Sequence, residues 1–535
     1  MTVADIYSTV PKPTPRTQTI DIGDGLIMRW STKDDLEDIE EFLAEAFRWI
    51  ALGRSFEDVE TPAPNQIAAR IGARAVRGDH IVASEYDYAI VVDTRATVHG
   101  SNKRSKVVAG LYLQHHSGYF GDVELKIGGV EAVGTLEEYR SKGLIRKLMM
   151  ELMLPTLDAE GHLIQIIGGI PHFYSAFGFE YALRFRDSAT IKDLNAIPPR
   201  PKVGEKQEEE PFTLRPPTRQ DIPYMARLAH HTQLPGQPQI GLEYNNKYWE
   251  WTAFTSLEQA SSYYDSGRLT RIIVDATTGK DVGVVVLGIL ATPSLEVFAL
   301  EEGASYRDAV FPVLRQVLDL ARERFDKPLE EAAEAAKKAT TDEERANLLL
   351  VEYKLPRISS LSLQFPECHP VRQLTRSIAP GNPNCYRLYT RIPSYADLIM
   401  KTRPVLEQRL AKSAMAGMTA RVQLDFYCRA EGQEGRGLEI VLERGQIIAA
   451  HPWKPLSPKE KHDKARAEKA AKVKPATIFS AGFVPLSFTR LVVGDSDLDE
   501  LQRAYPATMA FGDEAKMLLE ILFPKVNHQF DGLYV

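Results

Sequence analysis

The stretch that decides the fold is Gly129–Met153, GVEAVGTLEEYRSKGLIRKLMMELM. An apolar segment ends at Thr135, a short polar turn follows, and residues 140–143 open a helix predicted over 141–153. The apolar side chains of this helix recur at helical spacing and fall on one face: Leu144, Ile145, Leu148, Met149 and Leu152. The pattern predicts a strand, a turn and an amphipathic helix in direct succession.

A strand, a turn and a helix with a glycine in its first turn are typical of an anion-binding site. Free backbone N–H groups and the positive end of the helix dipole face the ligand there. Gly143 has no side chain that would block a phosphate, and Arg140 and Arg146 add charge-assisted contacts. On spacing alone, an ordinary strand-to-helix crossover with a capping glycine explains the pattern equally well.

The segment Arg140-x-x-Gly143-x-Ile145 resembles the R/Q-x-x-G-x-G/A motif with which GNAT acetyltransferases bind the pyrophosphate of acyl-CoA. It departs from that motif at Ile145, where the family has Gly or Ala. This departure resembles one branch of the superfamily, the enhanced intracellular survival (Eis) proteins. That branch commonly has a proline where this chain has Leu136.

The resemblance implies an acetyl-CoA site and assigns residues to it. Val133 and Thr135 would pair through their backbone with the pantetheine arm, and a strand N–H near Val133 would polarise the thioester carbonyl. The implied pyrophosphate site comprises Arg140, Ser141, Lys142, Gly143, Leu144, Ile145 and Arg146.

A second segment, Pro171–Phe179, resembles the Y-x-x-F-G-F/Y segment of GNAT proteins. In that family the tyrosine faces the thioester sulfur and acts as general acid, a role that here falls to Tyr174. A tyrosine beside Phe173 and Phe177 would otherwise be explained by core packing. The motif upstream favours the catalytic interpretation.

The amine acceptor must lose a proton before it attacks, so the reaction needs a base. Residues 483–525 resemble the sterol-carrier-like last domain of the same branch, in which the terminal carboxylate of the chain acts as base. The resemblance therefore implies the α-carboxylate of Val535. Glu131 is the second candidate, because Val133 and Thr135 lie on its face of the strand.

The expected fold class is α/β with mixed sheets: tandem GNAT folds followed by a sterol-carrier-like domain. Residues 27–41 and 213–226 form a weak internal repeat of a short strand, an Arg, a Thr and an acidic residue that leads into a helix. The expected divisions are a flexible arm (1–18), a catalytic GNAT domain (19–196), a linker (197–212), a degenerate GNAT-like domain (213–395) and a sterol-carrier-like domain (396–535). Charged insertions are expected at 326–345 and 454–474.

The composition is that of a soluble globular chain, and a net charge of −7 gives no general attraction to nucleic acid. No apolar run is long enough for a membrane span and no secretory leader is evident, so a cytoplasmic location is expected. The three cysteines are scattered. The neighbours His115 and His116 should point to opposite faces of a strand, and no metal is expected.

Two functions remain open at this point. One is an acetyltransferase for a small-molecule or peptide amine; the other is a non-enzymatic carrier of lipids or other hydrophobic molecules with a vestigial GNAT core. The presence of Arg140, Gly143 and Tyr174 together favours the enzyme. The identity of the amine stays open. The Eis branch forms hexamers, so a homo-oligomer is a further possibility that the insertions could block.

Overall fold

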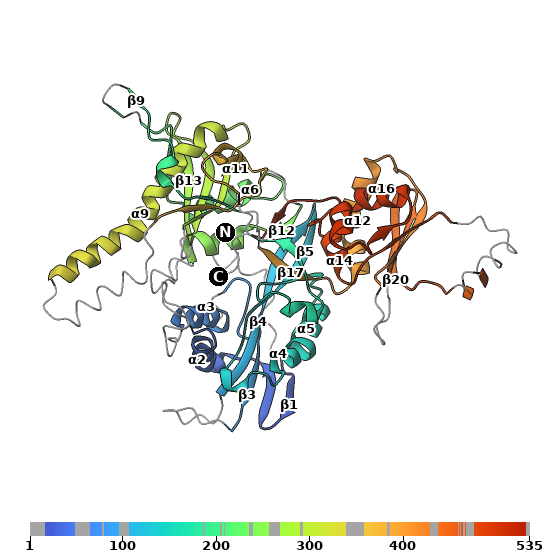
Figure 1. Cartoon of the computed structure of the whole chain (residues 1–535). Coiled ribbons are helices and arrows are strands. Elements are labelled where there is room, and N and C mark those ends of the chain that lie inside the picture. The colour runs from blue at the N-terminus through green and yellow to red at the C-terminus, as the bar shows by residue number, and fades with distance from the viewer. Residues whose placement is uncertain are drawn as a thin grey trace.

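The structure is a computed structural model with three α/β bodies around a common centre (Figure 1). Each body contains its own mixed sheet. The residues it describes are 16–48, 65–77, 80–95, 106–185, 188–203, 206–207, 209–234, 239–255, 268–288, 293–338, 358–381, 386–427, 437–457, 459–460, 462–463, 466 and 476–530.

The first sheet has the strand order β1-β2-β3-β4-β5-β6-β17-β7, and β12 and β23 extend it beside β4. Neighbours are antiparallel except for two parallel pairs, β5 with β6 and β12 with β23. The strands are β1 (Thr19–Gly23), β2 (Leu26–Trp30), β3 (Tyr88–Asp93), β4 (Lys106–Phe120), β5 (Val123–Thr135), β6 (Ile164–Ile167), β7 (Glu180–Arg184), β12 (Ile240–Leu242), β17 (Arg387–Arg391) and β23 (His528–Gln529). The mixed α/β class expected from the sequence is confirmed.

Helices pack on this sheet around a buried apolar core. They are η1 (Lys33–Asp35), α2 (Leu36–Ala46), α3 (Gln66–Arg77), η3 (Glu137–Tyr139), α4 (Leu144–Lys147), the π-helical η4 (Leu148–Met153), α5 (Leu154–Ala159) and η5 (Phe173–Phe177). The helix predicted over 141–153 begins at Leu144 instead, and α4, η4 and α5 form one run. It begins there because Ser141 and Gly143 both adopt left-handed backbone angles, with φ of 62° and 71°, which a right-handed helix cannot contain.

The second sheet has the order β11-β13-β14-β15-β16-β8. Its strands are β8 (Ala189–Ile191), β11 (Phe212–Arg215), β13 (Arg268–Asp275), β14 (Asp281–Gly288), β15 (Ser294–Leu300) and β16 (Leu361–Leu363). Its helical segments are η6 (Leu194–Ala196), η7 (Arg219–Asp221), α6 (Ile222–Leu228), α7 (Asn246–Glu250), the π-helical η8 (Trp251–Thr255), α9 (Tyr306–Lys338) and α11 (Pro370–Thr375). The end of α9 extends away from the rest of the molecule (Figure 1), so the charged stretch after 326 begins as exposed helix.

The two halves of the sequence repeat have the same local geometry. Arg29 forms a two-bond ion pair with Asp35, whose carboxylate also accepts from the N–H and the hydroxyl of Thr32. Arg215 forms the same pair with Asp221, and Thr218 takes the place of the cap. Each half therefore uses a strand arginine to fix the acidic residue that caps the next helix.

Strands cross the expected divisions of the chain. β8, which falls within 19–196, pairs with β16 in the second sheet, and β17, which falls within 213–395, pairs with β6 and β7 in the first. The segment 197–212 contains the short hairpin β9 (Lys202–Val203) and β10 (Lys206–Gln207). It also contains the buried Glu210, which accepts hydrogen bonds from Arg315.

The third sheet has the order β20-β19-β18-β21-β22. Its elements are β18 (Ala420–Asp425), β19 (Gly437–Glu443), β20 (Gln446–Trp453), β21 (Ile478–Gly482), β22 (Met509–Ala510), α12 (Tyr395–Ala411), α14 (Ser487–Val492), α15 (Leu498–Ala504) and α16 (Asp513–Leu522). α12 contacts β20 and also β5, so it joins this domain to the first sheet. In the described part of the chain, no helix combines the length and apolar character needed to cross a bilayer.

Candidate active site

The candidate site lies at the end of β5 that is not paired with β6. β5 pairs with β6 from Ile127 to Val130, and the pairing ends there. Residues 127–130 are buried, whereas 131–135 are all half-buried. The second half of β5 therefore has an accessible edge on the side where β6 ends.

A β-bulge reshapes this part of β5. Gly134 lies opposite Gly110 and Glu131 lies opposite Tyr112, so Ala132 and Val133 share one position on β4. Ala132 has a φ of 50°, in the left-handed region. The bulge removes Ala132 and Val133 from the regular ladder with β4 and increases the local twist.

The strand leads into an exposed turn. Arg140 donates from Nε to the carbonyl of Thr135 at 3.5 Å, and residues 140–143 are exposed. A Cβ placed on Gly143 would have no atom within 4 Å, so the space on that side is open. Ser141 and Gly143 are both left-handed around Lys142, a backbone geometry suited to a concave, anion-binding set of N–H groups.

Of the first helical residues after the turn, some pack against the core and others are exposed on the surface. Leu144 is buried and Ile145 packs half-buried against the core, which accounts for a branched residue where the family has Gly or Ala. Arg146 is exposed, and its guanidinium lies 5.4 Å from the centre of the Phe177 ring. This cation–π contact joins the turn to the segment that carries Tyr174.

Tyr174 lies in η5 and is buried, with its ring edge-on to Phe173 at 5.0 Å. A Cβ on Gly169 would lie only 3.1 Å from the Tyr174 hydroxyl, and Gly169 has a φ of 151°, so a glycine is needed there. Burial first, and then the charges of Glu131 and Tyr386, raise the pKa of Tyr174 well above its usual value. Tyr174 therefore keeps its proton at neutral pH.

Glu131 has an unusual environment for a carboxyl group. Burial raises its pKa to about 8, and a hydrogen bond from the backbone of Ala132 offsets only part of this effect. Across the ladder, Gln114 donates to the Tyr112 hydroxyl at 2.8 Å, and His116 lies 2.9 Å from the Gln114 amide oxygen. A chain of buried polar side chains thus starts beside Glu131.

The structure places the sequence-predicted residues as follows. Val133 and Thr135 lie on the accessible half of β5 that precedes 140–146, and Tyr174 is close enough to Glu131 for the Glu131 charge to affect the Tyr174 pKa. The expectation that Glu131, Val133 and Thr135 share one face is wrong. Across the bulge Glu131 shares its face with Gly134, because their partners Tyr112 and Gly110 are two residues apart on β4. Val535 lies outside the described residues.

Sequence reasoning missed two tyrosines that hold the Tyr174 segment: Tyr386, directly before β17, and Tyr389 within it. The hydroxyl of Tyr386 accepts from the N–H of Gly169, and that of Tyr389 accepts from the N–H of His172, both at 2.6 Å. The two tyrosines are three residues apart, which does not match strand alternation, and they follow the segment that they hold by more than 200 residues. Local sequence patterns therefore give no sign of these contacts.

Comparison with known proteins identifies this region. Residues 28–182 match the family described as acetyltransferase (GNAT) domain. They form a GNAT acetyltransferase domain. This confirms the superfamily expected from the motifs, and the fold implies an acyl-CoA cosubstrate.

Solved structures extend the likeness in fold beyond this GNAT domain. A GCN5-related N-acetyltransferase from Kribbella flavida is 13% identical with a TM-score of 0.52, and the match covers 95% of this chain and 98% of that one. Another from Anabaena variabilis is 12% identical with a TM-score of 0.55, covering 94% and 99%. A probable N-acyltransferase from Enterococcus faecalis is 13% identical with a TM-score of 0.54, covering 95% and 99%. No curated protein matches the sequence. At these identities the structures show a shared fold along nearly the whole chain.

Proposed function

We propose that this protein is an acetyl-CoA-dependent N-acetyltransferase that moves an acetyl group to a primary amine by direct attack. One observation carries the proposal: the accessible half of β5, with its bulge at Ala132, leads through the single short helix η3 into the exposed left-handed turn before Leu144. A strand edge that suits the extended pantetheine arm of acetyl-CoA is thus followed by a turn that suits its pyrophosphate.

In this proposal the backbone does most of the binding. Val133 and Thr135 bind the pantetheine arm, and the N–H groups from Ser141 to Arg146 bind the pyrophosphate. The N–H of Val133, which the bulge removes from the ladder with β4, donates to the thioester oxygen as negative charge develops on it.

Proton transfer falls to side chains at the same edge. The base is the terminal carboxylate of Val535 or Glu131, and Glu131 has the support of its position on the edge and of a pKa near the operating range of a base. After the amine attacks, Tyr174 donates its proton toward the departing thiolate. Because the raised pKa makes Tyr174 a weaker acid than a thiol, Tyr174 first stabilises the thiolate by a hydrogen bond, and full transfer of the proton is uphill.

The other two domains shape the site in this proposal. The middle domain is a second GNAT fold without the R/Q-x-x-G-x-G/A motif, and the repeated Arg–Thr–Asp geometry supports its common origin with the first. The C-terminal domain is sterol-carrier-like, as in the Eis branch. The acceptor is a small-molecule or peptide amine.

The test is calorimetric titration of the full chain with acetyl-CoA. Wild type should bind at micromolar concentration, and Gly143→Glu and Arg140→Ala should weaken binding at least tenfold, because the first places a negative side chain in the turn and the second removes a positive one. Gly303→Glu is a matched control: Gly303 is also left-handed, with a φ of 84° and open space at its Cβ, but lies in the middle domain.

Either of two results would count against the proposal. Absence of binding by wild type would favour the carrier of hydrophobic molecules. Equal losses in Gly143→Glu and Gly303→Glu would show that the effect comes from backbone strain instead of the turn.

A further inference from the structure

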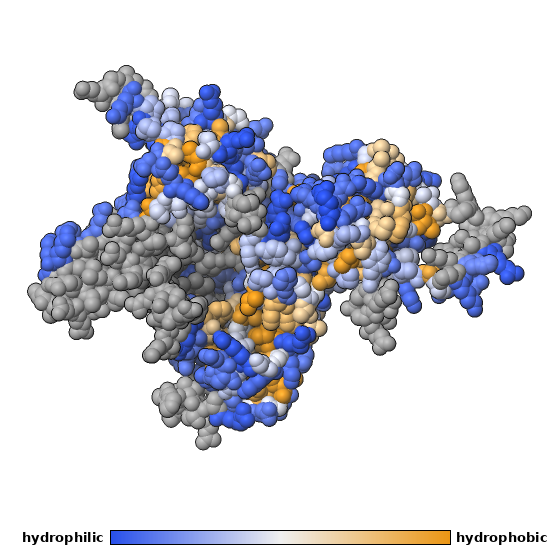
Figure 2. All heavy atoms as spheres, viewed as in Figure 1, coloured by the Kyte–Doolittle hydropathy of each residue, from blue (hydrophilic) through white to orange (hydrophobic). Residues whose placement is uncertain are grey.

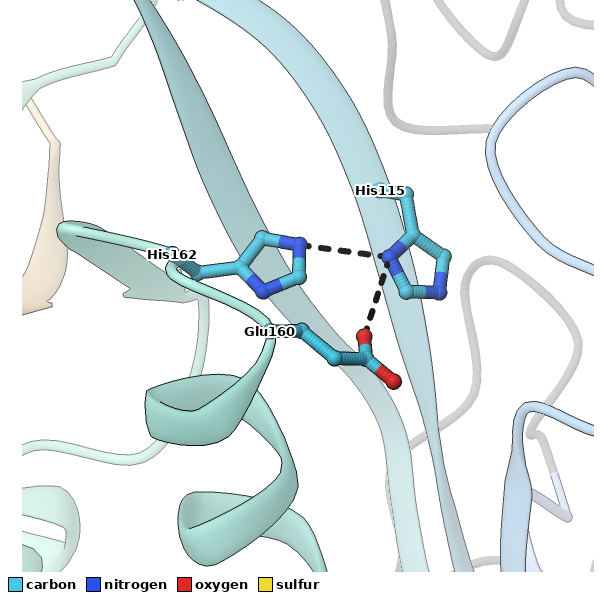
Figure 3. Close-up of side chains that lie close together, drawn as sticks. All are labelled: His115, Glu160 and His162. Carbon is cyan, nitrogen blue, oxygen red and sulfur yellow. Dashed lines mark hydrogen bonds and ion pairs between the residues drawn. The ribbon is translucent and has the colours of Figure 1, made fainter. Parts of the chain in front are cut away.

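Three metal-ligating side chains converge at a place that the proposed reaction does not use. His115 comes from β4, Glu160 follows α5 and His162 precedes β6 (Figure 3). The Nδ1 atom of His115 lies 3.2 Å from Nε2 of His162 and 3.7 Å from a carboxylate oxygen of Glu160. One ligand atom from each of the three residues lies within 4.8 Å of the other two.

The hydrogen bonds around the two histidines fix which ring nitrogens carry protons. Nδ1 of His162 lies 3.2 Å from the carbonyl of Leu157, which can only accept, so this nitrogen is the donor. Nε2 of His115 lies 3.1 Å from the carboxylate of Asp87, so this nitrogen is also the donor. In the neutral rings, Nδ1 of His115 and Nε2 of His162 therefore each carry a lone pair, and these two lone pairs face each other.

Two lone pairs at this separation repel unless a cation lies between them. A proton or a metal ion can fill that role. The third ligand favours a metal ion, because one Glu160 oxygen accepts from Arg16 at 2.7 Å and the other faces His115. All three ligands thus have an outer partner that orients them, which is how proteins hold metal ligands.

The sheet makes room for this arrangement. Gly128 lies opposite His115 in the β4–β5 ladder, and a Cβ on Gly128 would lie 3.2 Å from the His162 ring and 2.2 Å from Leu157. A glycine there lets the α5–β6 turn approach the strand. His162 is buried, whereas the side chains of His115 and Glu160 remain 36% and 35% exposed, so an ion can enter from solvent.

We propose that His115, Glu160 and His162 bind a divalent transition-metal ion, with Zn²⁺ the best match. Two imidazole nitrogens and a carboxylate oxygen are a common zinc ligand set. Bonds of about 2.0–2.1 Å in a tetrahedral ion place ligand atoms about 3.3 Å apart, close to the two spacings that His115 makes. Water occupies the fourth position. Asp87 and Glu160 balance the charges of Arg16 and Lys126, so the preference for a cation comes from the ligand atoms themselves.

Sequence reasoning expected no metal because no histidines are spaced as a ligand pair. His115 and His116 do have different partners, as strand alternation predicts. The second ligand comes from a turn 47 residues later, which spacing could not reveal.

The test uses the full chain, freed of metal with a chelator and titrated with Co²⁺, whose visible absorption bands report tetrahedral ligation. Wild type should bind one equivalent, and Zn²⁺ should displace the Co²⁺ and abolish the bands. His115→Asn and Glu160→Gln change half-exposed side chains, so they test the site without disturbing the core; each should weaken binding at least tenfold. Asp87→Asn should weaken it about 10–100-fold through the orientation of His115.

The second cluster in the described residues, His230, His231 and Glu243, serves as the control. There the His231 ring bonds Glu243 directly at 3.0 Å, so the double variant His230→Ala/His231→Ala should keep the Co²⁺ bands. Bands that persist in His115→Asn and vanish in the control would overturn the proposal. So would wild type that binds no Co²⁺, since a shared proton then bridges the two rings.

Discussion

Glu131→Gln should stabilise the folded protein, and by an amount that grows with pH. Burial raises the folded-state pKa of Glu131 from 4.5 to about 8, so the folded chain holds this proton more tightly than the unfolded chain does. Between these two values the unfolded state binds fewer protons, and the stability of wild type falls as pH rises. Glutamine has the same shape and has no charged form to desolvate.

The size of the effect follows from the pKa difference. Each pKa unit corresponds to about 1.4 kcal/mol, so this group costs wild type about 3 kcal/mol at pH 7 and almost nothing below pH 4.5. The advantage of Glu131→Gln should therefore grow by about 1.4 kcal/mol per pH unit from pH 5 toward pH 8 and then level off. For a domain of this size, about 3 kcal/mol raises the melting temperature by about 6–12 °C.

Scanning calorimetry of both proteins at a series of pH values measures this difference. Glu124→Gln is the control, because Glu124 is exposed on the same strand and its replacement should give a difference that does not change with pH. A difference between wild type and Glu131→Gln that stays constant from pH 5 to 9 would refute the argument that the fold holds Glu131 as a neutral acid.

The same variant separates the two candidate bases. If Glu131 is the base, acetylation by wild type rises with pH to a plateau above about pH 8, and Glu131→Gln loses this rise along with most of its turnover. If Glu131→Gln turns over normally, the terminal carboxylate becomes the better candidate.

Two further perturbations address the proposed chemistry. Tyr174→Phe should lower turnover about 10²–10⁴-fold, as expected for loss of a general acid, while calorimetry shows nearly unchanged acetyl-CoA affinity; unaltered turnover would exclude Tyr174 as the acid. Residues appended after Val535 should lower turnover strongly if its carboxylate is the base, whereas an extended chain with wild-type steady-state rates would exclude that role.

The local elements of the site were predictable from the sequence because short-range patterns fix them. The succession of strand, turn and helix around Gly143 follows from apolar periodicity and from the conformational freedom of glycine. The full length of β4 could not be predicted: its apolar run ends at Leu113, whereas the strand extends to Phe120. Polar residues such as His115 interrupt the apolar run, and only tertiary contacts show that they continue the strand.

The bulge at Ala132 could not be predicted in this way. Alanine gives no signal for a left-handed conformation, which costs most residues roughly 1–2 kcal/mol. The surrounding ladder imposes it, because β4 and β5 pair on both sides of the shift. A strained residue at the start of the accessible edge is what a binding site on a strand requires, since the bulge releases backbone groups that a regular ladder would use.

The residues that build the candidate site extend beyond residues 28–182, which match the acetyltransferase family. The hydroxyls of Tyr386, directly before β17, and of Tyr389 within β17 hold the backbone at Gly169 and His172, ahead of Tyr174. β17 also fills the sheet between β6 and β7. The orientation of Tyr174 therefore depends on a strand that follows the whole second sheet in sequence. A chain that ended after the family match at residue 182 would lack this strand, so a later part of the chain completes the first sheet.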